Sequence, residues 1–297
     1  MPSAARRPTW RELLEREKPL VLPGAHDALS ARLIEMAGFS AYVIGGFPLV
    51  GTRYGLPDLG LVSLGEMAEG VRDIMRGSRL PVLIDGDDGY GDVKNVTRTV
   101  RTYQQLGAAA LFIEDQVAPK RCGHMAGKDV IPTELMVQKI KAAAAARESR
   151  DLFLIARTDA RAVHGLDDAL RRGEAYIKAG ADGLFVEAPL SVEELERIAR
   201  AFDVPQFCNM LDGGRTPILS NRELYEMGFA MVVHGITLAM RVAKTMRDAL
   251  ADLRADRLSF AGTSVSFEEW KDIMCFGDWA AVEDRFGADG GPADRKA

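Results

Sequence analysis

The chain has 297 residues, which is long enough for one large domain or two ordinary domains. Hydrophobic residues make up 47% and charged residues 27%, as in an ordinary globular protein, and the formal net charge of −5 argues against nucleic-acid binding. No apolar run reaches the length of a membrane span, and no apolar signal core follows the basic N-terminus, so we expect a cytoplasmic protein with no membrane partner.

Short apolar segments alternate with amphipathic segments along most of the chain. This pattern predicts eight strands, each followed by a helix, with a long loop after the second strand. The predicted strands are Leu20–Gly24, Ala41–Gly46, Val82–Asp85, Ala109–Glu114, Leu152–Arg157, Gly183–Glu187, Pro205–Asn209 and Ala230–His234. The predicted helices are Thr9–Lys18, Asp27–Gly38, Ser63–Met75, Val93–Leu106, Thr133–Arg147, Leu166–Ala179, Val192–Phe202, Asn221–Met227 and Ile236–Leu253.

The alternation of strands and helices favours parallel strand pairing. Eight such units over about 230 residues fit a (β/α)8 TIM-type barrel, which we place at residues 1–255. A doubly wound open sheet is the alternative, and the first strand is not followed by the GxGxxG motif that such a sheet often carries. The sequence therefore favours the barrel.

The last part of the chain, residues 256–297, differs in composition from the barrel. Between Phe267 and Phe286 it carries more aromatic side chains than a solvated tail would. We expect a C-terminal helical arm that packs either on the barrel of its own chain or on a neighbouring subunit. Residues 287–297 are predicted to be disordered.

Carboxylates follow two neighbouring predicted strands at their carboxyl ends, where the active sites of (β/α)8 barrels lie. Asp85 and Asp87 follow the third strand, and Glu114 ends the fourth. Taken singly, either aspartate is explained as a turn cap, and Glu114 as an ion-pair partner of Arg157. Taken together, they require pairing, protonation or a bound cation. Oxygen ligands without a nearby His/Cys pair favour Mg²⁺, with Mn²⁺ as the alternative.

Polar residues also end three later strands. Arg157 is suited to bind a substrate carboxylate or phosphonate, and its structural alternative is an ion pair with Glu187. Asn209 is a candidate for hydrogen bonding to a carboxylate, or for tying two loops together. His234 is interpreted as a core histidine and not as a catalytic one.

Cys122 stands in a polar loop with the sequence Lys120-Arg121-Cys122-Gly123-His124. A lone cysteine is most often a small buried apolar side chain, but cations on both sides suit a thiol that exchanges a proton. Cys208 and Cys275 lie in apolar runs and are expected to be inert. Three widely spaced cysteines indicate neither a disulfide framework nor a zinc site.

Seven motifs stand in order along residues 9–255: Gly24-Ala25-His26-Asp27-Ala28-Leu29-Ser30-Ala31, Leu56-Pro57-Asp58-Leu59-Gly60, Asp85-x-Asp87-x-Gly89-Tyr90-Gly91, Ile113-Glu114-Asp115-Gln116, Lys120-Arg121-Cys122-Gly123-His124, Ala156-Arg157-Thr158-Asp159-Ala160 and Asn209-Met210-Leu211-x-Gly213-Gly214-x-Thr216-Pro217. With them the chain resembles the isocitrate lyase/phosphoenolpyruvate mutase superfamily. Met125-x-Gly127-Lys128 and residues 209–217 make it similar to the branch of petal death protein, 2,3-dimethylmalate lyase, oxaloacetate hydrolase and carboxyphosphonoenolpyruvate phosphonomutase.

This resemblance implies a Mg²⁺ enzyme for small carboxylates and a homotetramer that exchanges its C-terminal helix between neighbours. The implied metal site consists of Asp85 as direct ligand, Asp87 and Glu114 as holders of metal-bound water, and Asp58 close by. The implied substrate contacts are the backbone amides of Gly45 and Gly46, with Gly123, Arg157 and Asn209. The implied catalytic residues are Cys122, His124, Arg157 and Glu187, of which Arg157 and Glu187 also hold the far end of the substrate.

The implied reaction is cleavage of the C2–C3 bond of a 2-hydroxy dicarboxylate similar to a 2-alkylmalate. The metal favours the alkoxide, an α-keto acid is released, and the remaining enolate is protonated by Cys122 as general acid. The loop around Cys122 closes over the site as a lid and excludes water.

Several positions depart from the family pattern. Gly45 stands where Ser or Thr is common, and Gly86 and Asp88 alter a metal motif that commonly is Asp-Ala-Asp-Thr-Gly. Asp88 is expected to add negative charge near the metal. Val43 replaces a tyrosine of the methylisocitrate lyases, which disfavours that substrate.

Two alternatives to the lyase remain open. One is a phosphonomutase or an enzyme that processes phosphonopyruvate or oxaloacetate, because the phosphonomutase branch keeps the same cysteine motif. The other is a non-catalytic barrel used for binding or assembly, against which the intact Asp85, Glu114 and Cys122 argue.

Overall fold

The computed structural model describes residues 6–257 and 262–287. Its strands are β1 (Leu20–Pro23), β2 (Tyr42–Ile44), β3 (Val82–Asp85), β4 (Ala110–Glu114), β5 (Phe153–Thr158), β6 (Gly183–Val186), β7 (Gln206–Asn209) and β8 (Met231–His234). Its helices are α1 (Trp10–Arg16), α2 (Ala28–Met36), α3 (Gly46–Tyr54), α4 (Leu64–Met75), α5 (Val93–Leu106), α6 (Thr133–Ala146), α7 (Ala160–His164), α8 (Leu166–Lys178), α9 (Val192–Arg200), α10 (Asn221–Met227), α11 (Thr237–Arg254), α12 (Phe267–Ile273) and α13 (Phe276–Phe286).

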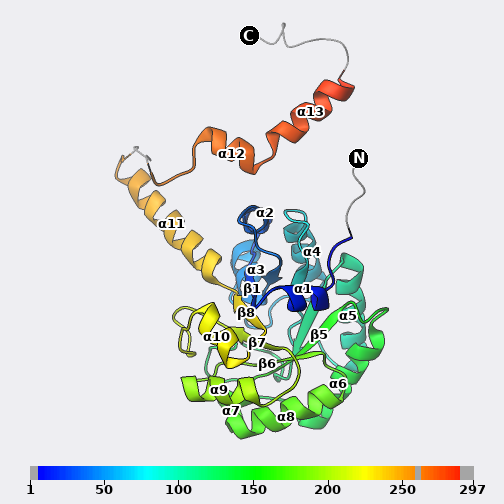
Figure 1. Cartoon of the computed structure of the whole chain (residues 1–297). Coiled ribbons are helices and arrows are strands. Elements are labelled where there is room, and N and C mark those ends of the chain that lie inside the picture. The colour runs from blue at the N-terminus through cyan, green and yellow to red at the C-terminus, as the bar shows by residue number, and fades with distance from the viewer. Residues whose placement is uncertain (1–5, 258–261, 288–297) are drawn as a thin grey trace. The chain divides into compact units, whose positions relative to one another are not determined.

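The eight strands form one parallel sheet with the order β1-β8-β7-β6-β5-β4-β3-β2. A parallel bridge pairs Gly24, the residue after β1, with Val43 in β2. This bridge connects the two edge strands, so the sheet closes on itself. Helices surround the strands (Figure 1). The predicted (β/α)8 TIM-type barrel is therefore confirmed. No helix in the described ranges is both long and apolar enough to span a bilayer.

Two helices were not predicted. Residues 46–54, expected to be loop, form α3, and the short helix α7 follows β5. The sequence Gly45-Gly46-Phe47-Pro48 is typical of a turn, but here Gly45 is the N-cap and Pro48 lies in the first helical turn. Proline is tolerated there because the first N–H groups of a helix have no intrahelical acceptor. The expected long loop after β2 was therefore wrong.

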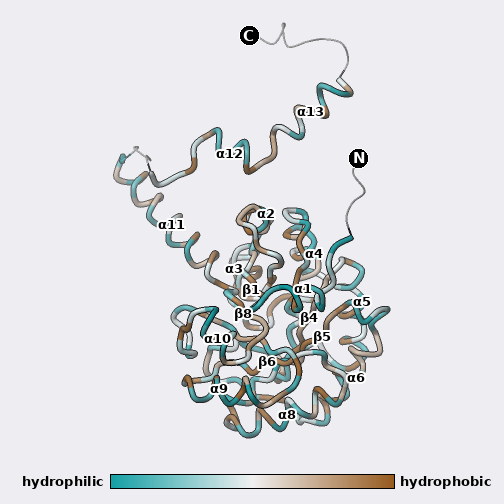
Figure 2. The backbone as a smooth tube through the Cα atoms, viewed as in Figure 1, coloured by the Kyte–Doolittle hydropathy of each residue, from teal (hydrophilic) through white to brown (hydrophobic). Residues whose placement is uncertain are grey.

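The barrel interior is filled by one cluster of apolar side chains. Phe112, Phe185 and Phe207 meet there, with the last two rings stacked 4.0 Å apart. Trp10 and Leu13 of α1 belong to the same cluster, so α1 covers the end of the barrel opposite the carboxyl ends of the strands. A second cluster lies between strands and helices, and Figure 2 shows hydrophobic and hydrophilic residues alternating along the outer helices.

The chain divides into two compact units, residues 1–244 and 245–297, so the division falls inside α11. The second unit contains α12 and α13, which confirms helical structure between Phe267 and Phe286. Within this unit Phe267, Trp279 and Phe286 remain 74%, 72% and 71% exposed, so the arm does not bury its own aromatic side chains. Disorder was predicted for residues 287–297, of which residues 288–297 lie outside the described residues.

Candidate active site

The carboxylates predicted at the ends of β3 and β4 lie together in the structure. The backbone N–H of Asp87 donates to Asp85 Oδ1 (2.9 Å), and the N–H of Glu114 donates to the carbonyl of Asp87 (2.9 Å). Asp87 has a φ of 48°, a left-handed conformation that is uncommon for a residue with a side chain. On the other side, Gly46 at the start of α3 donates its N–H to Asp85 Oδ2 (3.1 Å). These bonds orient the Asp85 carboxylate and hold the backbone segments that carry Asp87 and Glu114 next to it.

Burial leaves these carboxylates short of compensating charge. Burial, together with the nearby Asp87, raises the pKa of Asp85 to about 6. Burial also raises the pKa of Glu114 well above its usual range, although Arg157 opposes the shift. Such shifts arise where negative charge lacks a cation.

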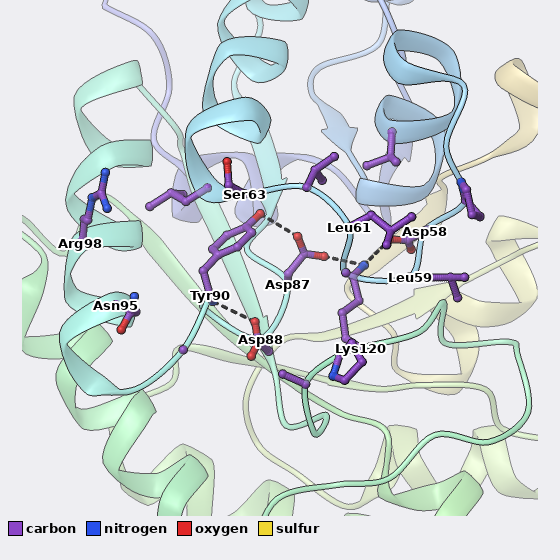
Figure 3. A pocket seen from close by; sticks show the side chains of 18 residues that line it. Asp58, Leu59, Leu61, Ser63, Asp87, Asp88, Tyr90, Asn95, Arg98 and Lys120 are labelled. Atoms are coloured by element: carbon purple, nitrogen blue, oxygen red, sulfur yellow. Dashed lines mark hydrogen bonds and ion pairs between the residues drawn. The ribbon is translucent and has the colours of Figure 1, made fainter.

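Lys120, for which the sequence predicts no role beyond its place in the cysteine motif, lies among these acids. Its Nζ is 2.5 Å from both Asp58 Oδ1 and Asp87 Oδ1, and Tyr90 Oη donates to Asp87 Oδ2 (2.6 Å), as Figure 3 shows. Burial alone would lower the pKa of Lys120, but the surrounding carboxylates, Asp87 first among them, raise it well above its usual value. The ammonium therefore stays charged and occupies one side of the acidic cluster.

The residues fit a hydrated Mg²⁺ ion but not a cage of protein ligands. Among the residues described, no three His, Cys, Asp or Glu side chains are placed to hold one metal ion between them. Mg²⁺ usually keeps several waters and uses one or two carboxylates, so direct binding by Asp85 with water-mediated contacts to Asp87 and Glu114 needs no such group. Glu114 Oε1 is buried and has no hydrogen-bond partner in the described ranges, as expected for an acceptor of metal-bound water.

The charge that Asp88 was expected to add beside the metal is offset. Its carboxylate accepts the backbone N–H of Tyr90 (2.9 Å) and lies 3.8 Å from Lys139 Nζ, which also donates to the Asp88 carbonyl (2.7 Å). Lys139 comes from α6, far from Asp88 in the sequence. Asp88, which departs from the family motif, is therefore accompanied by the nearby cation Lys139.

Arg157, at the end of β5, is surrounded by acids. Its Nε donates to Asp159 Oδ2 (2.9 Å) and lies 3.2 Å from Glu114 Oε2, and its Nη2 lies 3.2 Å from Glu187 Oε2. The guanidinium carbon also lies over the Phe185 ring, 5.2 Å from the ring centroid. The alternative of an Arg157–Glu187 ion pair is thus present in the structure, and Arg157 also faces the cavity described below.

His124 connects the cysteine loop with the loop after β7. Its Nδ1 accepts the backbone N–H of Arg215 (3.0 Å), and its Nε2 lies 3.1 Å from Glu187 Oε1. Because Nδ1 is the acceptor, the proton of the neutral ring is assigned to Nε2, which faces the carboxylate. Burial raises the pKa of Glu187, but Arg157 and His124 lower it more strongly, so the net pKa is lowered. Glu187 is therefore an ionised partner that orients both side chains.

A cavity of about 70 Å³ brings most of the predicted site residues together. Those that line it are Gly45, Gly46, Asp58, Asp85, Glu114, Cys122, Gly123, His124, Arg157 and Asn209. Asp87 instead faces a neighbouring cavity of about 400 Å³, beyond Lys120 (Figure 3). Glu187 is not among the lining residues of either cavity and lies beside Arg157 and His124.

Two residues of the cysteine loop, Cys122 and Gly123, face this cavity. One carries a proton donor, and the other lets the loop lie close to Arg157. Burial raises the pKa of the Cys122 thiol, with the His124 backbone N–H opposing the shift, so the thiol is protonated at neutral pH and able to donate a proton. A Cβ on Gly123 would collide with Arg157 Nη2 and Glu187, so glycine is required for the loop to lie this close. Asn209 Oδ1 is buried without a hydrogen-bond partner in the described part of the chain.

The remaining candidates have structural explanations. His234 Nε2 lies 2.9 Å from Asn221 Oδ1, which ties the end of β8 to α10, as expected of a satisfied core histidine. Cys208 is buried, and burial raises the pKa of its thiol far above the usual range, so it is inert.

The barrel thus brings an acidic cluster, a buried guanidinium and a half-buried thiol together at the carboxyl ends of its strands, where (β/α)8 enzymes carry their active sites. The phosphoenolpyruvate phosphomutase family model matches residues 10–254. The chain is 42% identical to 2,3-dimethylmalate lyase of Eubacterium barkeri, covering 89% of this chain and 92% of the relative. It is 44% identical to 2-methylisocitrate lyase of Bacillus subtilis (strain 168), covering 79% and 77%.

Solved structures agree with these relatives. A structure of oxaloacetate acetylhydrolase with 3,3-difluorooxalacetate superposes with a TM-score of 0.89 at 29% identity, covering 95% of this chain and 97% of that one. A structure of phosphonopyruvate hydrolase with oxalate and Mg²⁺ gives a TM-score of 0.82 at 27% identity, covering 93% and 97%. The chain belongs to the isocitrate lyase/phosphoenolpyruvate mutase superfamily, as its motifs predicted, and its curated relatives include carbon–carbon lyases.

Proposed function

We propose that this protein is a Mg²⁺-dependent lyase that cleaves the C2–C3 bond of a 2-hydroxy dicarboxylate of the 2-alkylmalate type. The observation that carries the proposal is the convergence of three groups on one cavity: an acidic cluster short of positive charge, the Arg157 guanidinium and the protonated Cys122 thiol. The relation to 2,3-dimethylmalate lyase supports the substrate class.

The side chains of the cavity have distinct tasks in this reaction. Mg²⁺, when bound, supplies Lewis-acid polarisation of the substrate hydroxyl and carboxylate. The backbone amides of Gly45 and Gly46 at the start of α3 receive one carboxylate, as helix N-termini do, and the Gly46 N–H then exchanges its bond to Asp85 Oδ2 for the substrate. Arg157 and Asn209 hold the other, which places the C2–C3 bond between the acidic cluster and Cys122.

Bond cleavage leaves the electron pair of the C2–C3 bond on C3. There the adjacent carboxylate delocalises it, while C2 becomes the carbonyl carbon of the α-keto acid as the 2-hydroxyl loses its proton. Cys122 donates its thiol proton to C3, and the loop that carries it excludes water from the cavity. For 2-methylmalate the products are pyruvate and acetate.

The walls of the cavity support an alkyl substituent on the substrate. Phe47, Leu211 and Ile236 line it with apolar surface. Such surface favours methyl groups over a third carboxylate. Val43, which also lines the cavity and stands where the methylisocitrate lyases have a tyrosine, supports the same preference.

A phosphonate substrate is the second candidate. Arg157 is equally suited to a phosphonate group, and phosphonopyruvate hydrolase is among the similar structures. One experiment separates the two: proton NMR of the purified protein with Mg²⁺ and 2-methylmalate, 2,3-dimethylmalate, methylisocitrate, oxaloacetate or phosphonopyruvate. Pyruvate formed from 2-methylmalate or 2,3-dimethylmalate, and not after chelation of Mg²⁺, is the expected result. Acetate formed from oxaloacetate alone would instead indicate an oxaloacetate-processing enzyme. Turnover of phosphonopyruvate alone would contradict the lyase.

The assembly is also proposed. The exposed aromatic side chains of α12 and α13 support a homotetramer in which each arm packs on a neighbour. Light scattering coupled to size-exclusion chromatography is expected to give four subunits for the full chain. A monomer at micromolar concentration would contradict this assembly.

A further inference from the structure

Lys128 is a buried cation of the β4–α6 loop that the proposed mechanism leaves without a task. The base of this loop, residues 117–130, is closed by a bridge between Gln116 and Val130 and by the bond from Val117 N–H to the Asp129 carbonyl (2.9 Å). The Lys128 side chain is 2% exposed. Its Nζ lies 2.6 Å from Asp159 Oδ1 and also donates to the carbonyl of Gly123, next to Cys122.

Asp159 is shared between this lysine and Arg157. Its two oxygens accept Arg157 Nε (2.9 Å) and Nη2 (3.1 Å), while its backbone N–H donates to Asp115 Oδ1 (2.9 Å). Asp115 is itself fixed by Thr158 Oγ1 (2.8 Å) and Tyr176 Oη (2.8 Å). Asp159 therefore has a fixed position in the barrel, and Lys128 is the partner that the loop contributes to it.

The charge around Arg157 depends on that partner. Glu114, Asp159 and Glu187 all lie within 3.2 Å of the guanidinium. When all three carboxylates are ionised, they leave two uncompensated negative charges around Arg157 without Lys128 and one with it. Two negative charges repel an incoming substrate carboxylate more strongly than one, and burial of the cluster weakens solvent screening.

We propose that Lys128 is the positioning residue that couples loop closure to substrate binding. When the loop covers the cavity, the ammonium pairs with Asp159 and weakens the hold of Asp159 on Arg157, so that Arg157 can bind a substrate carboxylate. Through the Gly123 carbonyl the same ammonium holds Cys122 over the cavity. The inference rests on the proposed roles of Arg157 and Cys122 but is tested without turnover.

The test uses Lys128→Met, with Lys178→Met on the exposed face of α8 as a matched control. Alkylation by iodoacetamide is followed peptide by peptide with mass spectrometry. Cys122, half-buried in the loop, reports opening of the loop, and Cys208, buried in β7, reports unfolding of the barrel. We expect Lys128→Met to alkylate Cys122 at least about tenfold faster than the wild type, a factor that corresponds to ~1.4 kcal/mol. Cys208 is expected to stay unreactive, and Lys178→Met to behave as wild type.

Binding of oxalate in the presence of Mg²⁺ gives the second readout. We expect Lys128→Met to weaken it about tenfold, and Lys128→Arg, which keeps the charge, to recover part of the loss. An unchanged Cys122 rate, or a parallel rise at Cys208, would contradict the inference, because the lysine would then be irrelevant or merely structural. A protein that turns over nothing in the substrate panel yet shows the Cys122 effect would refute the proposed reaction and leave this coupling intact.

Discussion

Both ends of the barrel bury carboxylates, but they treat them differently. At the amino end of β6, Asp182 accepts the backbone N–H of Leu154 (3.0 Å), pairs with Arg11 (2.7 Å) and Arg150 (3.0 Å), and contacts Arg147. Burial raises the pKa of Asp182, but the Leu154 N–H, Arg147 and Arg150 together lower it by more than burial raises it. The net pKa is therefore below the usual range. At the carboxyl ends, Asp85 and Glu114 have raised pKa values.

The difference separates a stabilising acid from a functional one. Asp182 has several donors for its two oxygens, so folding supplies all the compensation that it needs. The acids of the cavity have been placed by backbone hydrogen bonds of the strand ends and left with Lys120 and Arg157 at the edges. Their remaining charge favours a cation from solution, which is how a barrel binds a metal without a cage of ligands.

The largest expected effect follows from removing the direct metal ligand. Asp85→Ala is expected to lower turnover at least about 10³-fold, the upper range for one lost electrostatic group at a reacting centre. The melting temperature without metal is expected not to fall, because the variant loses an acid that burial disfavours. Steady-state kinetics and thermal unfolding measure both. Substantial activity of the variant would refute the assignment of Asp85.

Cys122→Ser is expected to have the next largest effect. A serine hydroxyl is a far weaker acid than a thiol, so turnover should fall about 10²-fold or more. Oxalate binding with Mg²⁺ should remain, since it needs no proton donor, and calorimetry can show this. Full turnover by the serine variant would mean that another group protonates C3.

At the other end of the barrel the same kind of change should act on stability alone. Asp182→Ala leaves the buried Arg147 without its carboxylate and is expected to cost about 3 kcal/mol in the free energy of unfolding. Asp151→Ala, at an exposed position nearby, is the control and should stay within about 0.5 kcal/mol. Urea denaturation gives both values. Equal stability of the two variants would remove the contrast between the ends.

The smallest effect is a pH dependence. The pKa of Asp85 is about 6 in the folded state against an ordinary 3.8, so the folded state holds a proton that the unfolded chain has lost between these values. Its contribution to stability is therefore present below pH 4 and lost as the pH rises through about 6. Asp85→Asn should raise the melting temperature of the metal-free protein at pH 7.5 but not at pH 4. An equal shift at both pH values would contradict the raised pKa.

Much of this contrast could be predicted from the sequence, and some could not. Strand periodicity and glycine stops placed Asp85, Glu114 and Arg157 at strand ends, and barrel geometry then implied that they meet. The helix α3 was missed because Gly45-Gly46-Phe47-Pro48 also suits a turn. A local sequence pattern that suits both a turn and a helix does not show which of the two the packing of the whole chain favours.

The ion pairs that Lys128 and Lys139 make could not be predicted from the sequence, for a related reason. Lys139 offsets Asp88 from 51 positions away, and Lys128 reaches Asp159 from 31 positions away. Each pair depends on how segments far apart in the sequence pack against one another around the barrel. The spacing of residues in the sequence does not specify this packing. The family resemblance implies that Glu187 holds the substrate, and the sequence does not show that its side chain also contacts both Arg157 and His124.

Titration calorimetry with oxalate tests the central claim most directly, because it needs no knowledge of the substrate. If the acidic cluster binds a divalent cation, oxalate will bind the wild type in the presence of Mg²⁺ and will not bind it after chelation of the metal. Oxalate will not bind Asp85→Ala under either condition. Equal oxalate binding with and without Mg²⁺ would contradict the account, since Arg157 and the α3 amides would then suffice and the acidic cluster would have no part in holding the ligand.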